Sequence, residues 1–201
     1  MKKLITALSF LMMSAMVFAA EGPDELVKRT SEDVLAVVKT DKDIQAGNQD
    51  KIFKLAEEKI LPNFNFEKVS RMVLGKNWTQ ASPDQKVAFQ NEFKTLLLRT
   101  YATALSKYKN QVIEYKPLRM ADGATNATVK TSILQSGGQP IAVDYALEKN
   151  AEWKVYDIVI EGVSLVTNYR SQFAQEIRQN GLDSLIKKLA EKNSASSAKA
   201  N

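Results

Sequence analysis

Hydrophobic residues recur at helical spacing in the first half of the chain, at every second position in the middle, and at helical spacing again near the end. The first helical pattern covers residues 25–39, with Leu26 and Val34 on one face. A second covers residues 48–61 and stops before Pro62, which cannot continue a helix without losing a hydrogen bond. The chain is therefore expected to begin with amphipathic helices.

Two further helices have clear start signals. Asn65 is expected to cap a short helix that Gly75 ends. Residues 82–85, Ser-Pro-Asp-Gln, combine a serine cap, a proline at the first helical position and a glutamine that completes a capping box. The helix that follows is predicted to run to about Lys107. Its apolar stripe is wider than one ordinary seam and contains Phe89, Phe93, Leu96, Leu97, Thr100, Tyr101, Ala104 and Tyr108.

After Gln111 the period changes to two, which is typical of half-buried antiparallel strands. The predicted strands are 112–118, 127–134, 141–148 and 153–161, with turn residues between them. The last strand is apolar on both faces, so we expect it to lie centrally. One of its faces carries Tyr156, Ile158 and Ile160, and the other carries Trp153, Val155 and Val159.

Gly162 breaks the last strand, and Ser164 is predicted to cap a helix that covers residues 164–179. A short helix follows over 182–191, and residues 193–201 are predicted to form a disordered polar tail. This order of elements predicts one α+β domain over residues 20–192. Its antiparallel sheet of about four strands is expected to pack against several helices around an apolar pocket.

The N-terminus has the pattern of a cleavable export signal. Lys2 and Lys3 precede an uncharged apolar run over 4–18, and small residues follow it. The run is too short to span a bilayer, so we predict a signal peptide over 1–19. The expected location of the mature protein is the periplasm of a Gram-negative bacterium.

Composition removes several classes of function. The sequence has no cysteine and no histidine, which excludes disulfides, thiolate nucleophiles, zinc sites that need these ligands and Ser-His-Asp triads. Without Lys2 and Lys3, the 28 basic residues become 26 against 23 acidic residues, a net charge of +3. That charge is small for a nucleic-acid-binding protein, so no nucleic-acid partner is expected. No glycine-rich phosphate loop or calcium-loop spacing is present, so no cofactor or metal is expected.

Asp157 and Glu161 are carboxylates on an otherwise apolar strand, which allows an acid–base role without histidine. A periplasmic enzyme acting on a small apolar substrate is therefore an alternative hypothesis. Glu161 can equally accept hydrogen bonds from the backbone or from Arg170. A chaperone or adaptor with an exposed apolar groove is a third reading.

The long helix and the sheet carry more apolar side chains than one seam requires. Such a surplus can close a core or wall a ligand pocket, and both interpretations remain open from the residues alone. The side chains expected to face this space are Phe89, Phe93, Leu97, Tyr101, Val129, Ile141, Val143, Tyr145, Ile158, Ile160, Val163 and Leu165.

The segment 157–166 reads Asp-Ile-Val-Ile-Glu-Gly-Val-Ser-Leu-Val and is followed by Asn168, Tyr169 and Arg170. It resembles the signature of the toluene-tolerance, or MlaC, family of periplasmic phospholipid-binding proteins. The helices over 60–75 and 78–105 also resemble that family. The similarity covers about residues 25–189.

The resemblance implies a monomeric carrier rather than an enzyme, with phospholipid as cargo and no cofactor. Family members hold the acyl chains in an apolar cavity between sheet and helices. They pass lipid between an outer-membrane lipoprotein complex and an inner-membrane ABC transporter with a substrate-binding ring, which maintains outer-membrane lipid asymmetry. On this basis we expect Val163 to lie at the pocket and Tyr101 to line its opposite wall. The basic residues near the C-terminus are candidates for contact with acidic partners: Arg170, Arg178, Lys187 and Lys188.

Overall fold

The computed structural model describes residues 21–108, 110–135 and 137–198. The predicted signal peptide, 1–19, lies outside the described residues. The helices are α1 (Pro23–Thr40), α2 (Lys42–Gln45), α3 (Gln49–Leu55), α4 (Phe66–Leu74), α5 (Lys76–Gln80), α6 (Pro83–Ser106), α7 (Leu165–Asn180) and α8 (Leu182–Ala198). A π-helical turn (Ala56–Ile60) and a 3-10 turn (Leu61–Asn63) continue α3. Over these described ranges, no helix is long and apolar enough to cross a membrane.

The strands are β1 (Val112–Tyr115), β2 (Asn126–Leu134), β3 (Ile141–Lys149), β4 (Trp153–Ile160) and β5 (Val163–Ser164). They form one open antiparallel sheet in the order β1-β2-β3-β4-β5, so each strand pairs with its neighbours in sequence. The α+β fold class is confirmed. The sheet has one strand more than expected, because the chain turns back for two residues after β4.

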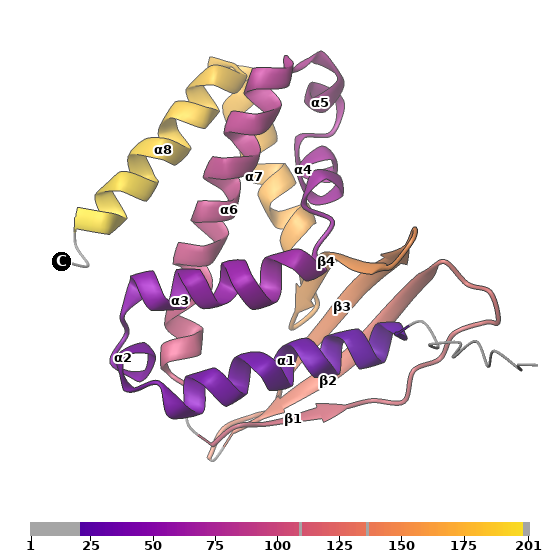
Figure 1. Ribbon diagram of the computed structural model, residues 1–201. Helices are drawn as coiled ribbons and strands as arrows, with labels where there is room; N and C mark the ends of the chain where they lie inside the picture. The colour runs from indigo at the N-terminus through magenta and orange to yellow at the C-terminus, as the bar shows by residue number, and fades with distance from the viewer. Residues whose placement is uncertain (1–20, 109, 136, 199–201) are drawn as a thin grey trace, which may run out of the picture.

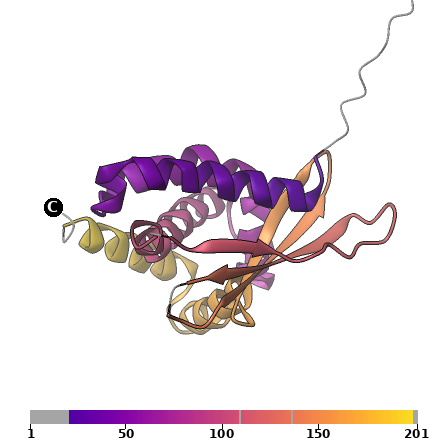
Figure 2. The same ribbon diagram turned by 90° about the horizontal axis from the view of Figure 1, so that it is seen from below.

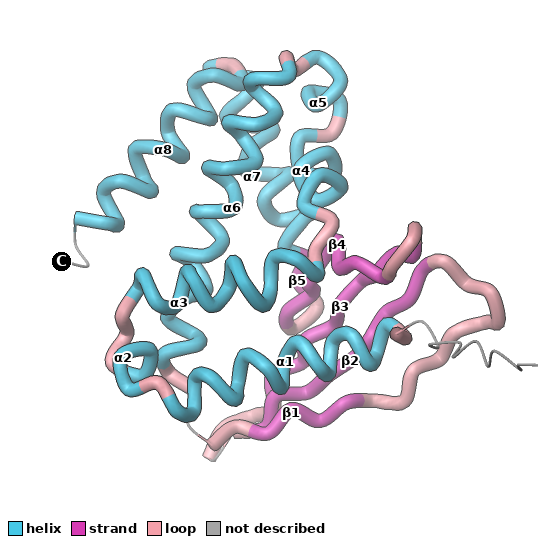
Figure 3. Tube along the Cα trace, in the orientation of Figure 1, coloured by secondary structure: helices cyan, strands magenta, loops and turns pink. Residues whose placement is uncertain are grey.

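The molecule has two parts that share the long helix α6. Helices α4, α5, α6, α7 and α8 form a bundle at one end, and the sheet lies at the other end (Figure 1, Figure 3). Helices α1 and α3 cross the region between them, and α1 lies over one face of the sheet. Figure 2 shows α1 on one side of the strands and α7 on the opposite side.

The bundle has its own aromatic core. The Phe93 ring lies 5.4 Å from Phe89, 5.1 Å from Tyr169 and 5.4 Å from Phe173, measured between ring centroids. Phe89 and Phe93 are almost completely inaccessible to solvent. Most of the apolar stripe predicted on the long helix therefore packs in the bundle with α4, α7 and α8, whereas the last turn of α6 lies beside the sheet.

The predicted capping signals are confirmed. The Gln85 N–H donates to Ser82 Oγ at 3.1 Å, and the Ser82 N–H donates to Gln85 Oε1 at 3.0 Å. Asn65 Oδ1 accepts from the Lys68 N–H at 3.0 Å, and α4 ends at Gly75, whose φ is 55°. These local bonds satisfy N–H groups that the first turn of a helix leaves without partners.

The segment with the family-like sequence forms the joint between the sheet and α7. Glu161 and Gly162 both have positive φ, 49° and 80°, and make the tight turn between β4 and β5. Such turns favour residues that tolerate the left-handed region, which a glutamate does at some cost. The Glu161 carboxylate accepts from the Ala142 N–H, and the Glu161 N–H donates to the Ala142 carbonyl at 2.9 Å. Ser164 then caps α7 by accepting from the Thr167 N–H.

A β-bulge changes the face assignment that was predicted for β4. Ala146 pairs with Asp157 and Leu147 pairs with Val155, so Tyr156 is an extra residue without a partner on β3. The alternation shifts at this point, and Val155 and Ile158 line the same cavity. Tyr156 instead packs against the bundle core. The predicted grouping of Tyr156 with Ile158 and Ile160 was wrong.

The last helix continues past its predicted end at Glu191 and includes residues predicted to be a disordered tail. Asn193 is buried, and its amide donates to the Glu92 carbonyl at 3.0 Å and to Glu92 Oε2 at 2.7 Å. These bonds attach α8 to α6 across the bundle. Residues 199–201 lie outside the described part of the chain.

Because Phe93 contacts the bundle core on several sides, Phe93→Ala is expected to lower the free energy of unfolding by about 3–5 kcal/mol. Urea denaturation followed by circular dichroism measures this change. The cavity described below does not include Phe93, so the folded variant should carry as much ligand as the unchanged protein. A loss of ligand without a loss of stability would contradict the separation of core and cavity.

Candidate functional site

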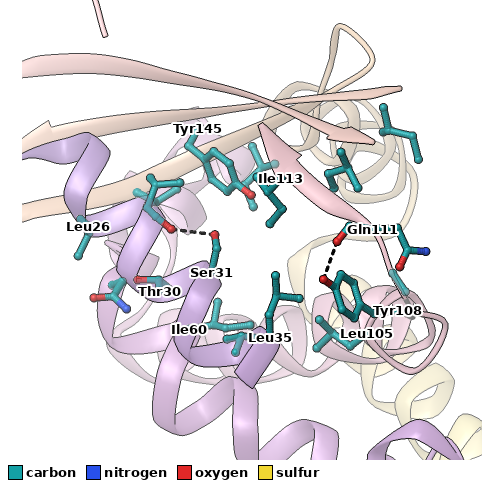
Figure 4. Close-up of a pocket in the computed structure, with 18 of the residues that line it drawn as sticks. Leu26, Thr30, Ser31, Leu35, Ile60, Leu105, Tyr108, Gln111, Ile113 and Tyr145 are labelled. Carbon is teal, nitrogen blue, oxygen red and sulfur yellow. Dashed lines mark hydrogen bonds between the residues drawn. The ribbon is translucent and has the colours of Figure 1, made fainter. Parts of the chain in front are cut away.

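An apolar cavity of about 450 Å³ lies between α1 and the sheet. This volume falls within the range of small-molecule binding sites. In Figure 4, Ser31 and Leu35 of α1, Ile113 and Tyr145 of the sheet, and Leu105 of α6 surround one common space. Three different parts of the fold thus supply its walls.

Each wall follows from the local pattern of the sequence. On α1, the pairs Leu26–Val27 and Val34–Leu35 widen the apolar face, so the helix covers the sheet and still lines the cavity. On the sheet, Ile133 of β2 is paired with Ile113 of β1 and with Ile141 of β3. Directly paired residues point to the same side of a sheet, so all three lie on one face. The remaining lining comes from the turn after α3 and the end of α6 and includes Ile60, Asn63, Phe64, Ala104, Leu105 and Tyr108.

Polar side chains gather at one end of the cavity. Lys107, Gln111 and Gln135 flank the places where α6 ends, β1 begins and β2 ends. The Tyr108 hydroxyl donates to the Gln111 carbonyl at 2.6 Å and closes the turn between α6 and β1 (Figure 4). Among the described residues that line the cavity, Lys107 is the one charged side chain, and none is acidic.

Tyr145 brings a buried hydroxyl to the sheet wall. Burial raises the pKa of Tyr145 to about 12, while contacts with Thr131 and Ser31 act in the opposite direction. Ser31 in turn donates to the Val27 carbonyl at 2.7 Å (Figure 4). The hydroxyl stays protonated over the whole physiological range, so it adds no charge to the cavity.

The side chains predicted to face a pocket are divided by the structure. Ile141, Tyr145 and Ile158 line the cavity, whereas Phe89, Phe93 and Leu97 belong to the bundle core. Val129, Val143, Ile160, Leu165, Tyr101 and Val163 do not line the cavity either. Val129 is buried under α1, and 56 % of Val163 is exposed next to the β4–β5 turn. Lipid contact by these side chains stays a prediction.

Sequence reasoning missed most of the α1 wall. The face with Leu26 and Val34 was identified, but its function as a cavity wall was not. The available signal was a second row of residues, Val27–Ser31–Leu35, which places two more aliphatic side chains next to the first stripe. A helix that packs only against a sheet needs a single apolar stripe, so the wider apolar face of α1 indicated a second surface to line.

The two carboxylates that suggested catalysis do not line the cavity. Asp157 accepts from the Ser164 hydroxyl at 2.5 Å and from the Val166 N–H at 3.1 Å, which ties β4 to the start of α7. Glu161 is engaged with Ala142 at the tight turn. Within the described residues, no three acidic side chains come together in a way that could hold a metal ion.

Comparison with known proteins identifies relatives along nearly the whole chain. The family model "MlaC protein" matches residues 28–191. The "Toluene tolerance protein ttg2D" of Pseudomonas putida is 29% identical over 167 residues, which cover 82% of this chain and 77% of that protein. The "Intermembrane phospholipid transport system binding protein MlaC" of Haemophilus influenzae is 30% identical over 204 residues, with coverages of 94% and 92%.

A solved structure has the same fold. The phospholipid-binding protein from Ralstonia solanacearum, determined in complex with a phospholipid, superimposes with a TM-score of 0.83 and 39% sequence identity. The match covers 89% of this chain and 99% of the Ralstonia chain. The similarity therefore includes the helices and strands that enclose the cavity.

Alkaline pH should reveal the burial of Tyr145. Below pH 10 the tyrosine is neutral in both states; between pH 10 and about 12 only the unfolded state ionises. The protein should therefore lose up to about 2–3 kcal/mol of stability from this group over that interval. Tyr145→Phe should lose less, as measured by urea denaturation at a series of pH values. An equally steep loss in the variant would show that the hydroxyl is not buried.

Asp157→Ala should destabilise the joint, because the Val166 N–H and the Ser164 hydroxyl lose their acceptor. We expect the free energy of unfolding to fall by about 1–3 kcal/mol. Thermal unfolding tests this, with Asp144→Ala on the neighbouring strand as a control that keeps the joint intact. Equal stability of the Asp157 variant and the unchanged protein would contradict the structural role.

Proposed function

The chain belongs to the MlaC family, and from this premise we propose that it is a phospholipid-binding transport protein whose cavity between α1 and the sheet holds acyl chains. The observation that carries the proposal is the chemistry of that cavity: aliphatic walls, neutral hydroxyls and no acidic side chain among its described lining residues. Acyl chains have no hydrogen-bonding groups, so such walls suit them. The phospholipid held by the similar Ralstonia protein supports the same conclusion.

The energetics of this function differ from those of an enzyme. Two acyl chains with about 30 methylenes gain on the order of 25 kcal/mol when they leave water. A bilayer offers nearly the same gain, so the cavity only has to match the membrane from which the lipid comes. The carrier mainly lowers the kinetic barrier, because it keeps the chains dry while they cross an aqueous space. No catalytic group is needed for this, and we assign none.

We further propose that the protein works in the periplasm and shuttles glycerophospholipids between outer-membrane and inner-membrane complexes. The predicted signal peptide, 1–19, and family membership support this location. The expected partners are an outer-membrane lipoprotein complex and an inner-membrane ABC transporter with a substrate-binding ring. Maintenance of outer-membrane lipid asymmetry is the expected outcome. The protein needs no cofactor in this scheme.

A substitution that fills the cavity should block lipid binding without unfolding the protein. Leu35 lines the cavity and is only partly buried, so Leu35→Trp can place its ring in that space. We expect extractable phospholipid per folded protein, measured as organic phosphorus, to fall several-fold, since the ring occupies volume that the chains need.

Ala36→Trp provides a matched control. Ala36 is the next residue on the same helix, is exposed, and does not line the cavity. The same ring there should leave phospholipid content and transfer between vesicle populations unchanged. If both variants carried as much phospholipid as the unchanged protein, the chains would not lie in this cavity. If the unchanged protein bound none after exposure to vesicles, the proposed function would be wrong.

A further inference from the structure

A second hollow of about 310 Å³ lies beside the apolar cavity and has a different character. The start of α1, the end of the 3-10 turn and the β3–β4 turn enclose it. Buried Leu26 and Trp153 contribute apolar surface, and charged side chains form much of the rest. The charged lining residues are Glu21, Arg29, Lys149, Glu152 and Lys154.

The hollow and the cavity are neighbours that share two lining residues, Leu26 and Asn63. Leu26 belongs to the apolar stripe of α1, and Arg29 follows it by less than one helical turn. A ligand that extends past Leu26 therefore leaves aliphatic walls and meets cations within a few ångströms along the helix. This change of environment matches the change from acyl chain to headgroup in a phospholipid.

The cations of the hollow are held by partners that a ligand can replace. Arg29 Nε lies 2.6 Å from Glu21 Oε1, and its Nη2 donates to Glu21 Oε2 at 3.0 Å. Lys154 Nζ lies 3.1 Å from Glu152 Oε2 and donates to the Pro62 carbonyl at 2.8 Å. Arg29 and Glu152 are substantially exposed, and exposed ion pairs contribute little to stability. A phosphate can thus exchange with a carboxylate at modest cost.

We propose that this hollow is the headgroup subsite, in which Arg29 and Lys154 bind the phosphodiester of the lipid whose chains fill the apolar cavity. The proposal rests on the phospholipid-binding function proposed above. The guanidinium of Arg29 offers two parallel N–H groups, the geometry that binds phosphate oxygens in pairs. Three cations against two carboxylates give the hollow a net charge of +1. An anionic phosphodiester fits this charge, and the carboxylates remain available for a headgroup ammonium.

The test uses the full mature protein, stripped of lipid and then exposed to vesicles of phosphatidylethanolamine and phosphatidylglycerol. The Arg29→Gln/Lys154→Gln double variant should bind phospholipid about tenfold more weakly, since each charge-assisted bond to phosphate is lost. Binding of a long-chain alcohol, which has no phosphate, should not change. Lys130→Gln is the matched control, because Lys130 is an exposed cation on β2 that lines neither space.

Glu21→Gln separates a ligand-binding role from a structural one. Removing this carboxylate breaks the same ion pair as Arg29→Gln but leaves the guanidinium available to phosphate. The subsite predicts that Glu21→Gln binds phospholipid as well as the unchanged protein or better. If Arg29 acts only as a structural partner of Glu21, both single variants should weaken binding equally, which would overturn the proposal.

The remaining outcomes are also distinct. Equal phospholipid affinity in the double variant and the unchanged protein would reject the subsite and leave the proposed function standing. Absence of phospholipid binding by the unchanged protein would reject the proposed function itself. Inorganic phosphate is expected not to displace lipid from the loaded protein, because the attached acyl chains hold the headgroup in the subsite. If inorganic phosphate bound the hollow of the loaded protein while the lipid stayed bound, the headgroup would not lie there. The hollow would then be a separate site for free phosphate.

Discussion

Contact between α1 and the inner face of the sheet determines where the protein can hold a ligand. Leu26 and Val27 of α1 pack in one buried cluster with sheet residues that include Val129, Leu147 and Val155. One helix cannot cover an open five-stranded sheet, however, and the part toward Ile113, Ile133 and Ile141 lies beside the cavity. The same apolar face thus acts as core at one end and as binding wall at the other. Stability and ligand capacity are linked through a single helix.

The bundle allows the cavity to stay open. Phe89, Phe93 and Phe173 pack together in a core that does not depend on the ligand space. The joint around Asp157 and Ser164 then fixes α7 to β4, so that the bundle and the sheet keep one orientation. The segment 157–166 makes this joint, so its distinctive sequence has a structural explanation and needs no catalytic one. Its residues make a tight turn, a helix cap and a partly buried hydrogen-bond acceptor, and each of these has a structural purpose.

The sequence was most informative where a signal is local. The cap at Ser82, the end of α4 at Gly75 and the alternation along β3 depend on a few neighbouring residues, and the structure contains all three. Long-range features could not be predicted in the same way. The bulge at Tyr156 depends on pairing with β3, and the partition of α6 between bundle and cavity depends on helices that pack from elsewhere in the chain. Asn193 was assigned to a tail because its partner, Glu92, lies about a hundred residues earlier.

The central claim is that lipid chains lie between α1 and the sheet, and photo-crosslinking tests it most directly. A phospholipid with a photoreactive group at the end of one acyl chain can be loaded from vesicles and illuminated, and the labelled peptides identified by mass spectrometry. We predict labels in peptides that contain Leu35, Leu105 or Ile113, which line the cavity. Labels confined to peptides of the bundle core around Phe93 and Phe173 would contradict this placement of the lipid.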